Sequence, residues 1–199
     1  MNETGTSAPD YAERLAKLQR RGWKTWLDVQ RPYRWNLRRL DPGRTLDIGC
    51  GIGRCLRTLP RGSVGVDHNE RAIEIVRSLG LVAYSPADFA MSADFAPQAF
   101  DTLLLSHVLE HMTPPEAVGT IAQYLGLLRD GGRVIVFCPQ EKGYASDPTH
   151  VTFLDAPALR RILVESSLRV ESSYSFPFPR VIGRWFPYNE FVMIARKGA

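Results

Sequence analysis

Two groups of residues in this sequence combine side chains that could carry out chemistry. In the first, LDIGCGIGRC at residues 46–55, an aspartate is followed by three glycines at alternate positions: Asp47, then Gly49, Gly51 and Gly53. Glycine is tolerated at this density where the backbone takes unusual dihedral angles or where another molecule lies against it. We therefore expect this turn to bind a ligand, and the acid before it favours a ligand with a cationic part.

The second group consists of His107, Glu110 and His111 in the string SHVLEH, together with His150 in DPTHVTF. The spacing i, i+3, i+4 brings the first three side chains to one side if the segment turns helical. An imidazole has an ordinary pKa of about 6.5, which suits it to accept a proton at neutral pH. The candidate catalytic residues are therefore His107, His111 and His150.

The elements that position these groups alternate between strand and helix. Apolar runs predict strands at 45–48, 63–69, 81–84, 100–108 and 133–139, and an antiparallel hairpin of 170–176 with 190–196. Helices are predicted near the N-terminus, at 35–40 after a break at Pro32, at 53–59, from Asn69 to Gly80, from Thr113 to the glycines at 131 and 132, and after Asp155. This alternation predicts a mainly parallel sheet covered on both faces.

In a doubly wound sheet, ligands bind at the carboxyl ends of the strands, and the first strand-turn-helix is the usual cradle. Asp67 follows the second strand, where a carboxylate can accept both hydroxyls of a ribose. A dinucleotide fingerprint would need glycine where Arg54 stands, which disfavours a nicotinamide-dependent dehydrogenase. Asp47 and Asp67 together predict a nucleoside that carries an ammonium group.

With these motifs the chain resembles the class I S-adenosylmethionine-dependent methyltransferases, of the type 11 and 12 kind. LDIGCGIGR, the acid in VGVDHN and the phrase FDTLLLSHVLEHM are similar to successive signatures of that family, over about residues 40–140. The resemblance implies an α/β, Rossmann-like, doubly wound sheet of seven strands, mainly parallel with an antiparallel last strand, and helices on both faces.

The same resemblance implies S-adenosyl-L-methionine as the cofactor. The residues that it assigns to the cofactor, or that neighbour it, are Asp47, Gly49, Cys50, Gly51, Gly53, Asp67, His68, Asp88 and His107. Asp88 would lie near the adenine amine, and Asp94 is the alternative for that place. We expect one methyltransferase domain over 1–199: a helical cap at 1–40, a cofactor-binding core at 41–140, and an acceptor-side loop, helix and closing hairpin at 141–199.

A metal ion is the alternative use of the histidine string. Ubiquinone-biosynthesis O-methyltransferases and small-RNA 2′-O-methyltransferases carry E-x-x-E-H at the matching place and hold a divalent ion there. This chain has His107 at the first position, and an imidazole in place of a carboxylate weakens the case for magnesium. We expect no metal; the ligand set of a metal-binding version would be His107, Glu110, His111 and His150.

The expected reaction is O-methylation of a hydroxyl on a small molecule or glycan. PQEKGYASDPTHVTF resembles acceptor-side segments of methyltransferases that modify sugars, and it gathers Glu141, Tyr144 and Asp147 beside His150. One alternative is an RNA methyltransferase with or without a metal, since residues 1–44 carry ten basic and five acidic side chains in a chain of net charge +4. A cofactor-binding module without catalysis is also compatible with the motifs.

Composition limits the remaining classes. The 199 residues, 44% of them hydrophobic, suit one domain with a full core, and the three cysteines form no C-x-x-C pair. No apolar run approaches the roughly 20 residues that span a bilayer, and the N-terminus lacks a secretion signal, so we expect a cytoplasmic protein without a membrane partner. Two aromatic regions could line the acceptor pocket: Trp23, Trp26, Tyr33 and Trp35, and residues 176–191. The oligomeric state stays open.

Overall fold

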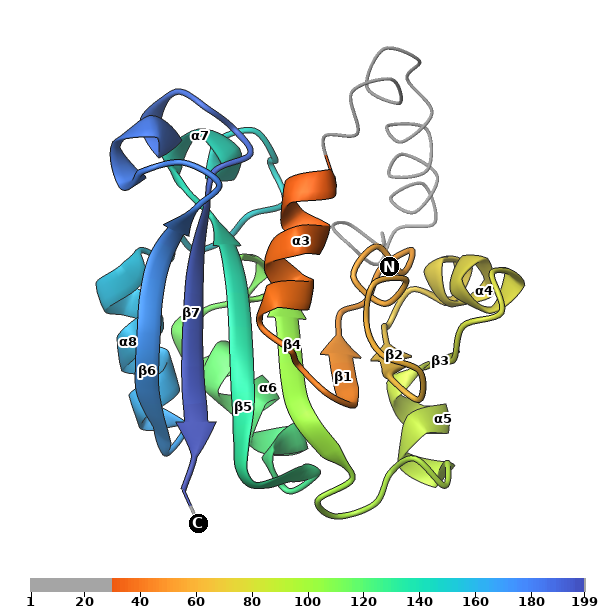
Figure 1. Cartoon of the computed structure of the whole chain (residues 1–199). Helices are drawn as coiled ribbons and strands as arrows, with labels where there is room; N and C mark the ends of the chain where they lie inside the picture. Colours follow the sequence, from red (N-terminus) through yellow and green to blue (C-terminus); the bar gives the residue numbers. More distant parts are fainter. Residues whose placement is uncertain (1–29, 199) are drawn as a thin grey trace. The chain divides into compact units, whose positions relative to one another are not determined.

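From residue 31 to residue 197 strands are interspersed with helices, and only the first two strands follow one another without a helix between them (Figure 1). The computed structural model describes residues 30–198, so the predicted N-terminal helix, Trp23 and Trp26 lie outside the described residues. The chain divides into two units, residues 1–94 and 95–199. The organisation as one methyltransferase domain remains a prediction.

The described part of the first unit, residues 30–94, contains three parallel strands and three helices. Its elements are α3 (Arg31–Arg39), β1 (Thr45–Ile48), β2 (Val64–Val66), α4 (Glu70–Ser78), β3 (Ala83–Tyr84) and α5 (Pro86–Met91). Strand β2 pairs in parallel with β1 on one side and β3 on the other. Every residue of β1 and β2 is buried, as expected for central parallel strands. Pro32 lies in the first turn of α3, where its fixed φ angle suits a helix start, and not at a break.

The segment after the glycine turn differs from the predicted helix at 53–59. Residues 51–58 form consecutive turns, in which bonds four residues apart, such as Arg57 N to Gly53 O, alternate with shorter bonds such as Thr58 N to Cys55 O. Gly51 and Gly53 have φ angles of 51° and 76°, which a right-handed helix does not contain. The predicted helix was therefore wrong. By contrast, the Asn69 side chain caps α4 by accepting from Ala72 N, as predicted.

Strand β3 is the edge of the sheet in the first unit, and its outer side is partly covered. The carbonyl oxygens of Val82 and Tyr84 accept hydrogen bonds from β2 and the residue after it. The carbonyl oxygen of Ala83, between them, faces the other way because successive carbonyls of a strand alternate. Arg77 Nε from α4 donates to this oxygen at 2.9 Å.

The second unit holds four strands and the helices between them. Its strands are β4 (Phe100–Ser106), β5 (Leu128–Pro139), β6 (Leu168–Phe176) and β7 (Glu190–Lys197). Its helices are the 3-10 turns η1 (Leu109–His111) and η2 (Arg180–Arg184) and the α-helices α6 (Pro114–Leu125), α7 (Glu141–Tyr144) and α8 (Ala156–Glu165). Strand β4 pairs in parallel with β5, whereas β7 runs antiparallel to both β5 and β6. The predicted closing hairpin is confirmed.

Helix α6 begins as predicted but ends earlier. Thr113 and Glu116 form the predicted capping box, in which Glu116 accepts from Thr113 N at 2.8 Å. The helix ends at Leu125, and the buried Leu128 already belongs to β5. The glycines at 131 and 132 lie within β5, beside an irregularity in its pairing with β4. Their assignment to the helix end was wrong, because these glycines form part of β5 at the point where its register with β4 shifts.

The strand order of the sheet is β3-β2-β1-β4-β5-β7-β6, with β7 antiparallel. This is the predicted Rossmann-like, seven-stranded α/β fold. In the second unit, α8 packs on β6 and β7, and the core includes Leu104, Ile135 and Leu163, each fully buried. Within residues 30–198, no helix has the length and apolar character that crossing a membrane would require.

Candidate functional site

The glycine turn after β1 has the conformation that its sequence predicts. Gly49, Gly51 and Gly53 all have positive φ angles, of 71°, 51° and 76°. A Cβ atom at Gly51 would meet nothing within 4 Å, whereas one at Gly53 would lie 3.1 Å from Val76. Gly53 is therefore favoured by its backbone angle, and a side chain there would also press on Val76, whereas the space beside Gly51 is open to a ligand.

Asp47, at the end of β1, is a buried carboxylate with an unpaired oxygen. Asp47 is 1% exposed, and its Oδ2 atom makes no hydrogen bond within the described part of the chain. Burial, and then the nearby charge of Asp67, raises the pKa of Asp47 to about 8. An orphaned buried oxygen costs free energy, so this group is suited to receive a hydrogen-bond donor that carries positive charge.

Asp67 follows β2 and lies beside the same turn. Its two oxygens accept hydrogen bonds from Gly51 N at 2.7 Å and from Asn69 N at 2.8 Å. The carboxylate therefore ties the glycine turn to the start of α4. His68 is exposed, with Nδ1 3.8 Å from Asp67 Oδ1. Burial and the two aspartates raise the pKa of the Cys50 thiol, so Cys50 stays uncharged.

The two acids considered for the adenine end differ in their surroundings. Asp88 is exposed in the first turn of α5, where Ser85 caps the helix, and lies 4.0 Å from Arg77. Asp94 is partly buried and accepts hydrogen bonds from Arg44 at 2.7 Å and from the Tyr84 hydroxyl at 3.1 Å. Asp88 is therefore the acid with more access to solvent.

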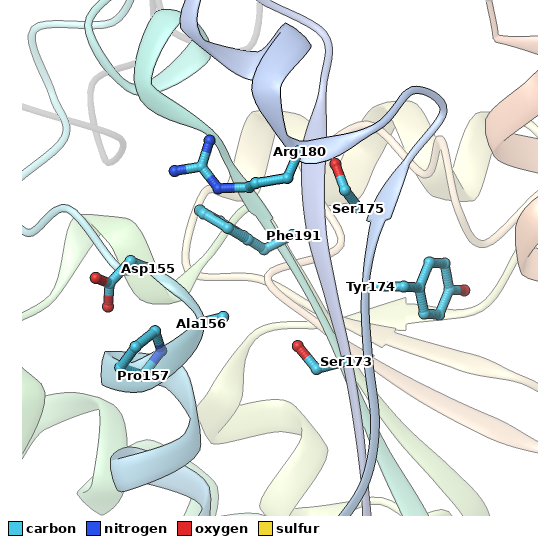
Figure 2. A pocket seen from close by; sticks show the side chains of 8 residues that line it. All are labelled: Asp155, Ala156, Pro157, Ser173, Tyr174, Ser175, Arg180 and Phe191. Atoms are coloured by element: carbon cyan, nitrogen blue, oxygen red, sulfur yellow. The ribbon is translucent and has the colours of Figure 1, made fainter.

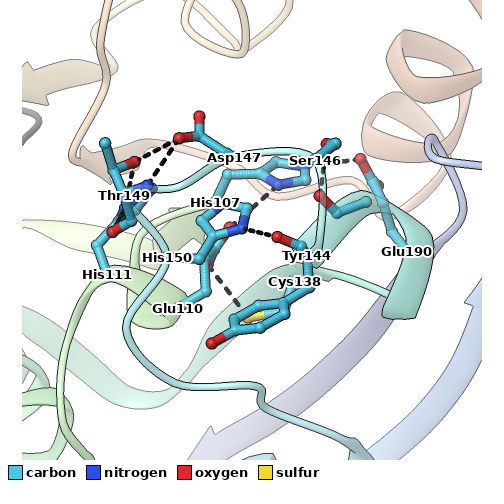
Figure 3. Close-up of polar contacts among 11 residues, drawn as sticks. His107, Glu110, His111, Cys138, Tyr144, Ser146, Asp147, Thr149, His150 and Glu190 are labelled. Atoms are coloured by element: carbon cyan, nitrogen blue, oxygen red, sulfur yellow. Dashed lines mark hydrogen bonds and ion pairs between the residues drawn. The ribbon is translucent and has the colours of Figure 1, made fainter.

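In the second unit, His107 lies between two carboxylates just after β4 (Figure 3). Its Nε2 atom is 2.8 Å from Glu190 Oε1, and its Nδ1 atom is 3.2 Å from Glu110 Oε1. Partial desolvation lowers the pKa of His107, whose side chain is 43% exposed, but the carboxylates of Glu190 and Glu110 raise it to about 10. His107 is therefore an imidazolium at neutral pH and has no lone pair for a proton or a metal ion.

Glu110 is the buried centre of this group. Its side chain is 1% exposed, and the Cys138 thiol donates to its Oε2 atom at 3.6 Å. Burial alone would raise the pKa of Glu110, but its contact with His107 lowers it, so Glu110 is a carboxylate. The backbone oxygen of Glu110 also accepts hydrogen bonds from Val151 and Thr152, which fixes the loop that carries His150.

His111 and His150 have their ring orientations fixed by backbone carbonyls. His111 Nδ1 is 3.0 Å from the Thr149 carbonyl oxygen, and His150 Nδ1 is 2.7 Å from the Tyr144 carbonyl oxygen. A carbonyl oxygen only accepts, so each Nδ1 donates a proton, and in the neutral ring Nε2 keeps its lone pair. The rings lie 4.9 Å apart, and Tyr144 stacks on His150 (Figure 3).

Glu110, His111 and His150 together form a set that could hold a metal ion. One ligand atom from each lies within 4.8 Å of the others. Imidazoles whose second nitrogen donates to a carbonyl are typical metal ligands, and one carboxylate with two imidazoles suits zinc better than magnesium. Of the four residues in the ligand set that the sequence suggests, the structure brings these three together, whereas His107 is engaged by its carboxylates.

Two members of this cluster were missed at the level of sequence. Glu190 starts β7 and Cys138 lies near the end of β5, far along the chain from His107 and Glu110. The predicted hairpin contained a signal for Glu190, because an antiparallel last strand begins at the edge where parallel strands end. Nothing in the sequence distinguished Cys138 from an ordinary core cysteine.

The insertion before β7 is held to the sheet by a buried polar network. Gln140 and Asn189 are fully buried and bond to one another, and both donate to Ser175 Oγ. Asn189 also accepts from Phe178 N at 2.9 Å. The network fixes η2, from which Arg180 pairs with Glu141 of α7. Trp35, from the other aromatic region, is 55% exposed in the first unit.

The fold and the glycine turn agree with the comparison with known protein families. Residues 15–173 match the model of a family described as a methyltransferase domain. The chain therefore belongs to this family of methyltransferase domains, and its sheet has the class I methyltransferase fold.

Two curated proteins are similar to parts of the chain. A ubiquinone biosynthesis O-methyltransferase from Vibrio atlanticus is 30% identical over 99 residues, which cover 46% of this chain and 41% of that protein. A tabtoxin biosynthesis enzyme from Pseudomonas amygdali pathovar tabaci is 29% identical over 147 residues, which cover 68% of this chain and 58% of that protein. The chain thus spans about half the length of these relatives.

A solved structure shows the same fold. A methyltransferase from Archaeoglobus fulgidus, described as dependent on S-adenosylmethionine, superimposes with a TM-score of 0.66 at 19% identity. The superposition covers 87% of this chain and 99% of that one. At this identity the likeness establishes the fold, and the acceptor must be argued from the chain itself.

Proposed function

We propose that this protein transfers the methyl group of S-adenosylmethionine to a hydroxyl oxygen of a small molecule or glycan. The cofactor supplies an activated methyl group on a sulfonium. The proposal has two parts, since the first unit offers the groups that would bind the cofactor and the second unit offers the groups that would act on the acceptor.

The glycine turn fits the amino acid end of the cofactor. The buried, unpaired oxygen of Asp47 would accept from the ammonium group, and the open space at Gly51 would let the ligand approach the backbone. Asp67 would accept the ribose hydroxyls through the lone pairs that Gly51 N and Asn69 N leave unused. Gly49, Gly53, Cys50 and His68 would surround these contacts, and Asp88 would lie near the adenine.

The hydroxyl acceptor is supported above all by the protonation pattern of His150. Methyl transfer from a sulfonium is an in-line displacement, so the protein must align the acceptor and remove its proton. The Tyr144 carbonyl holds the proton of His150 on Nδ1, which leaves Nε2 to act as the base. His111 has the same arrangement and is the second candidate. His107 is not proposed as the base or as a cofactor ligand, because its two carboxylates keep it protonated.

The test begins with mass-spectrometric screening of sugars, phenols and RNA for the gain of one methyl group. With the acceptor found, His150→Ala should lower turnover about 100-fold or more, the usual contribution of a general base. Its affinity for the cofactor should change little. His150→Asn is the matched control, since an amide can still donate to the Tyr144 carbonyl but cannot act as a base. Equal losses of turnover and cofactor affinity, or full activity of His150→Asn, would contradict the proposal.

A metal-assisted version of the same reaction is the second candidate, favoured by the close ligand atoms of Glu110, His111 and His150. A bound ion would lower the pKa of the acceptor hydroxyl, and these three residues would hold it. Metal analysis of the purified protein and activity after exhaustive chelation test this version. Full activity in a metal-free sample would exclude it.

Simple measurements separate the proposed reaction from RNA methylation and from a purely cofactor-binding role. If RNA is the acceptor, its affinity should fall steeply with added salt, because binding releases counterions from the phosphates. If the protein is a binding module, it should bind the cofactor but consume it with no compound in the screen.

A further inference from the structure

The second unit contains a cavity whose lining does not include His107, His111 or His150. It measures about 310 Å³ and lies between the start of α8, strands β6 and β7, and η2 (Figure 2). A volume of this size is at the lower end of the range for sites that bind small molecules. The cavity is therefore large enough for one ring of a ligand.

The lining combines apolar surface with a few polar groups. Ala156, Pro157 and Phe191 supply the apolar part, and Phe191 lies under the guanidinium of Arg180, 4.7 Å from ring centre to Cζ. Ser175 also lines the cavity, but its hydroxyl is already bonded to Gln140, Asn189 and Phe178. The buried polar network thus holds this wall in place before any ligand binds.

Two polar groups of the lining can still form hydrogen bonds with a ligand. Within residues 30–198, the Ser173 hydroxyl makes no hydrogen bond, and Asp155 uses only Oδ1, which accepts from Ala158 N at 2.9 Å. A hydroxyl and a carboxylate oxygen beside an apolar surface are the groups that recognise a ring bearing hydroxyl substituents. Both point to the same class of ligand.

The charges of the lining indicate whether the hydroxylated ring of the ligand is itself charged. Its charged members are one acid, Asp155, and one base, Arg180, which is already paired with Glu141. The cavity therefore has no excess positive charge for a phosphate or another anion. An uncharged hydroxylated ring fits, whereas a nucleic acid backbone does not.

A row of aromatic rings connects this cavity with His150. Tyr144 is 5.2 Å from His150, Phe153 is 5.3 Å from Tyr144, and Phe191 is 6.4 Å from Phe153, measured between ring centres. Phe153 is 36% exposed, and Val151, nearby in the chain, is 58% exposed. The surface between the proposed base and the cavity is thus apolar and partly open, which suits contact with one extended molecule.

We propose that the cavity is a subsite for a distal ring of the methyl acceptor, an uncharged ring with hydroxyl groups such as a sugar or a phenol. The inference rests on the proposed function, because it takes His150 as the position of the reacting hydroxyl. It implies an acceptor with at least two parts: one at His150 and one held by Ser173 and Asp155.

Ligand-observed NMR on the full chain tests the subsite without knowledge of the acceptor. The probes are phenyl β-D-glucoside, methyl β-cellobioside and catechol; the last two distinguish a sugar from a phenol. At least one should bind the unchanged protein. Ser173→Phe fills the cavity and should weaken that probe about tenfold or more. Ser172→Phe is the matched control, since Ser172 is also exposed but does not line the cavity, and it should leave binding unchanged.

Asp155→Asn separates ligand binding from helix capping, because asparagine caps helices as well as aspartate does. It should weaken the probe while leaving the thermal midpoint nearly unchanged. The proposal is overturned if no probe binds, if Ser173→Phe binds as tightly as the unchanged protein, or if a short RNA displaces the probe. Calorimetry with S-adenosylhomocysteine is run in parallel. If the unchanged protein does not bind S-adenosylhomocysteine, the proposed function is contradicted. If it binds S-adenosylhomocysteine but Ser173→Phe has no effect on the probe, only the subsite is contradicted.

Discussion

The affinity of this protein for S-adenosylhomocysteine should depend on pH, because Asp47 must lose a proton before it can pair with the ammonium group of the ligand. Burial and the charge of Asp67 raise the pKa of Asp47 to about 8. At pH 6 only about 1% of the unliganded protein then carries the carboxylate, and this fraction rises about tenfold for each pH unit until it levels off near pH 8. The association constant should rise with it by about tenfold per pH unit, which corresponds to about 1.4 kcal/mol of binding free energy.

At higher pH the trend should reverse, because the ammonium group of the free ligand then loses the proton that the buried carboxylate requires. The expected curve levels off near pH 8 and falls again as the ligand amine deprotonates. Binding at pH 6.5 should release about one proton, because Asp47 ionises as the ligand enters.

Calorimetry in two buffers measures this proton directly. At pH 6.5, the observed heat should differ between phosphate, which has a small heat of protonation, and Bis-Tris, which has a large one. Asp47→Asn should bind more weakly and show the same heat in both buffers. Asp94→Asn is the control, since this acid pairs with Arg44 and the Tyr84 hydroxyl, and it should keep the proton release. Equal heats in both buffers for the unchanged protein would refute the reasoning.

Three further predictions concern single residues. Asp67→Ala should weaken S-adenosylhomocysteine about 10- to 100-fold while the circular dichroism spectrum is retained, because charge-assisted hydrogen bonds to the ribose are lost; unchanged affinity would contradict the ribose assignment. His107 has its pKa raised from 6.5 to about 10, so its stabilising effect is complete below pH 6.5 and is lost as the pH rises through about 10. The free energy of unfolding in urea should therefore differ more between pH 8 and pH 10.5 for the unchanged protein than for His107→Gln. An equal difference in the two proteins would disprove the charged pairing of His107 with Glu190 and Glu110. Asn189→Ala should lower the free energy of unfolding by about 2–4 kcal/mol, since it leaves buried partners unsatisfied; a loss near zero would show that water replaces the amide.

Local hydrogen-bonding chemistry explains which parts of the fold could be predicted. The Asn69 cap and the box of Thr113 and Glu116 involve residues within one turn, so their spacing alone indicates the contact. The turns at 51–58 and the glycines of β5 were assigned wrongly for the opposite reason. In both places a positive φ angle or a strand irregularity, set by packing, overrides a pattern that also suits a helix.

The candidate site was predictable in its residue types and not in their partners. His107, Glu110, His111 and His150 stand out in the sequence because they are titratable groups at a strand end. The roles of these residues depend on distant contacts, however. Glu190 lies 83 residues after His107 and, with Glu110, converts this histidine from a candidate base into a fixed cation. The carbonyls that orient His150 and His111 come from the last residue of α7 and from the loop after it, whose path the sequence does not specify.

The guanidinium of Arg77 on the outer side of β3 has a consequence for assembly. An exposed strand edge is a template on which a second chain can add its own strand, through main-chain donors and acceptors left open. Here the Ala83 oxygen, which such a chain would need, is already taken. Growth of the sheet from this side must first displace a charged side chain, which protects the protein against edge-to-edge aggregation and directs strand-adding partners elsewhere.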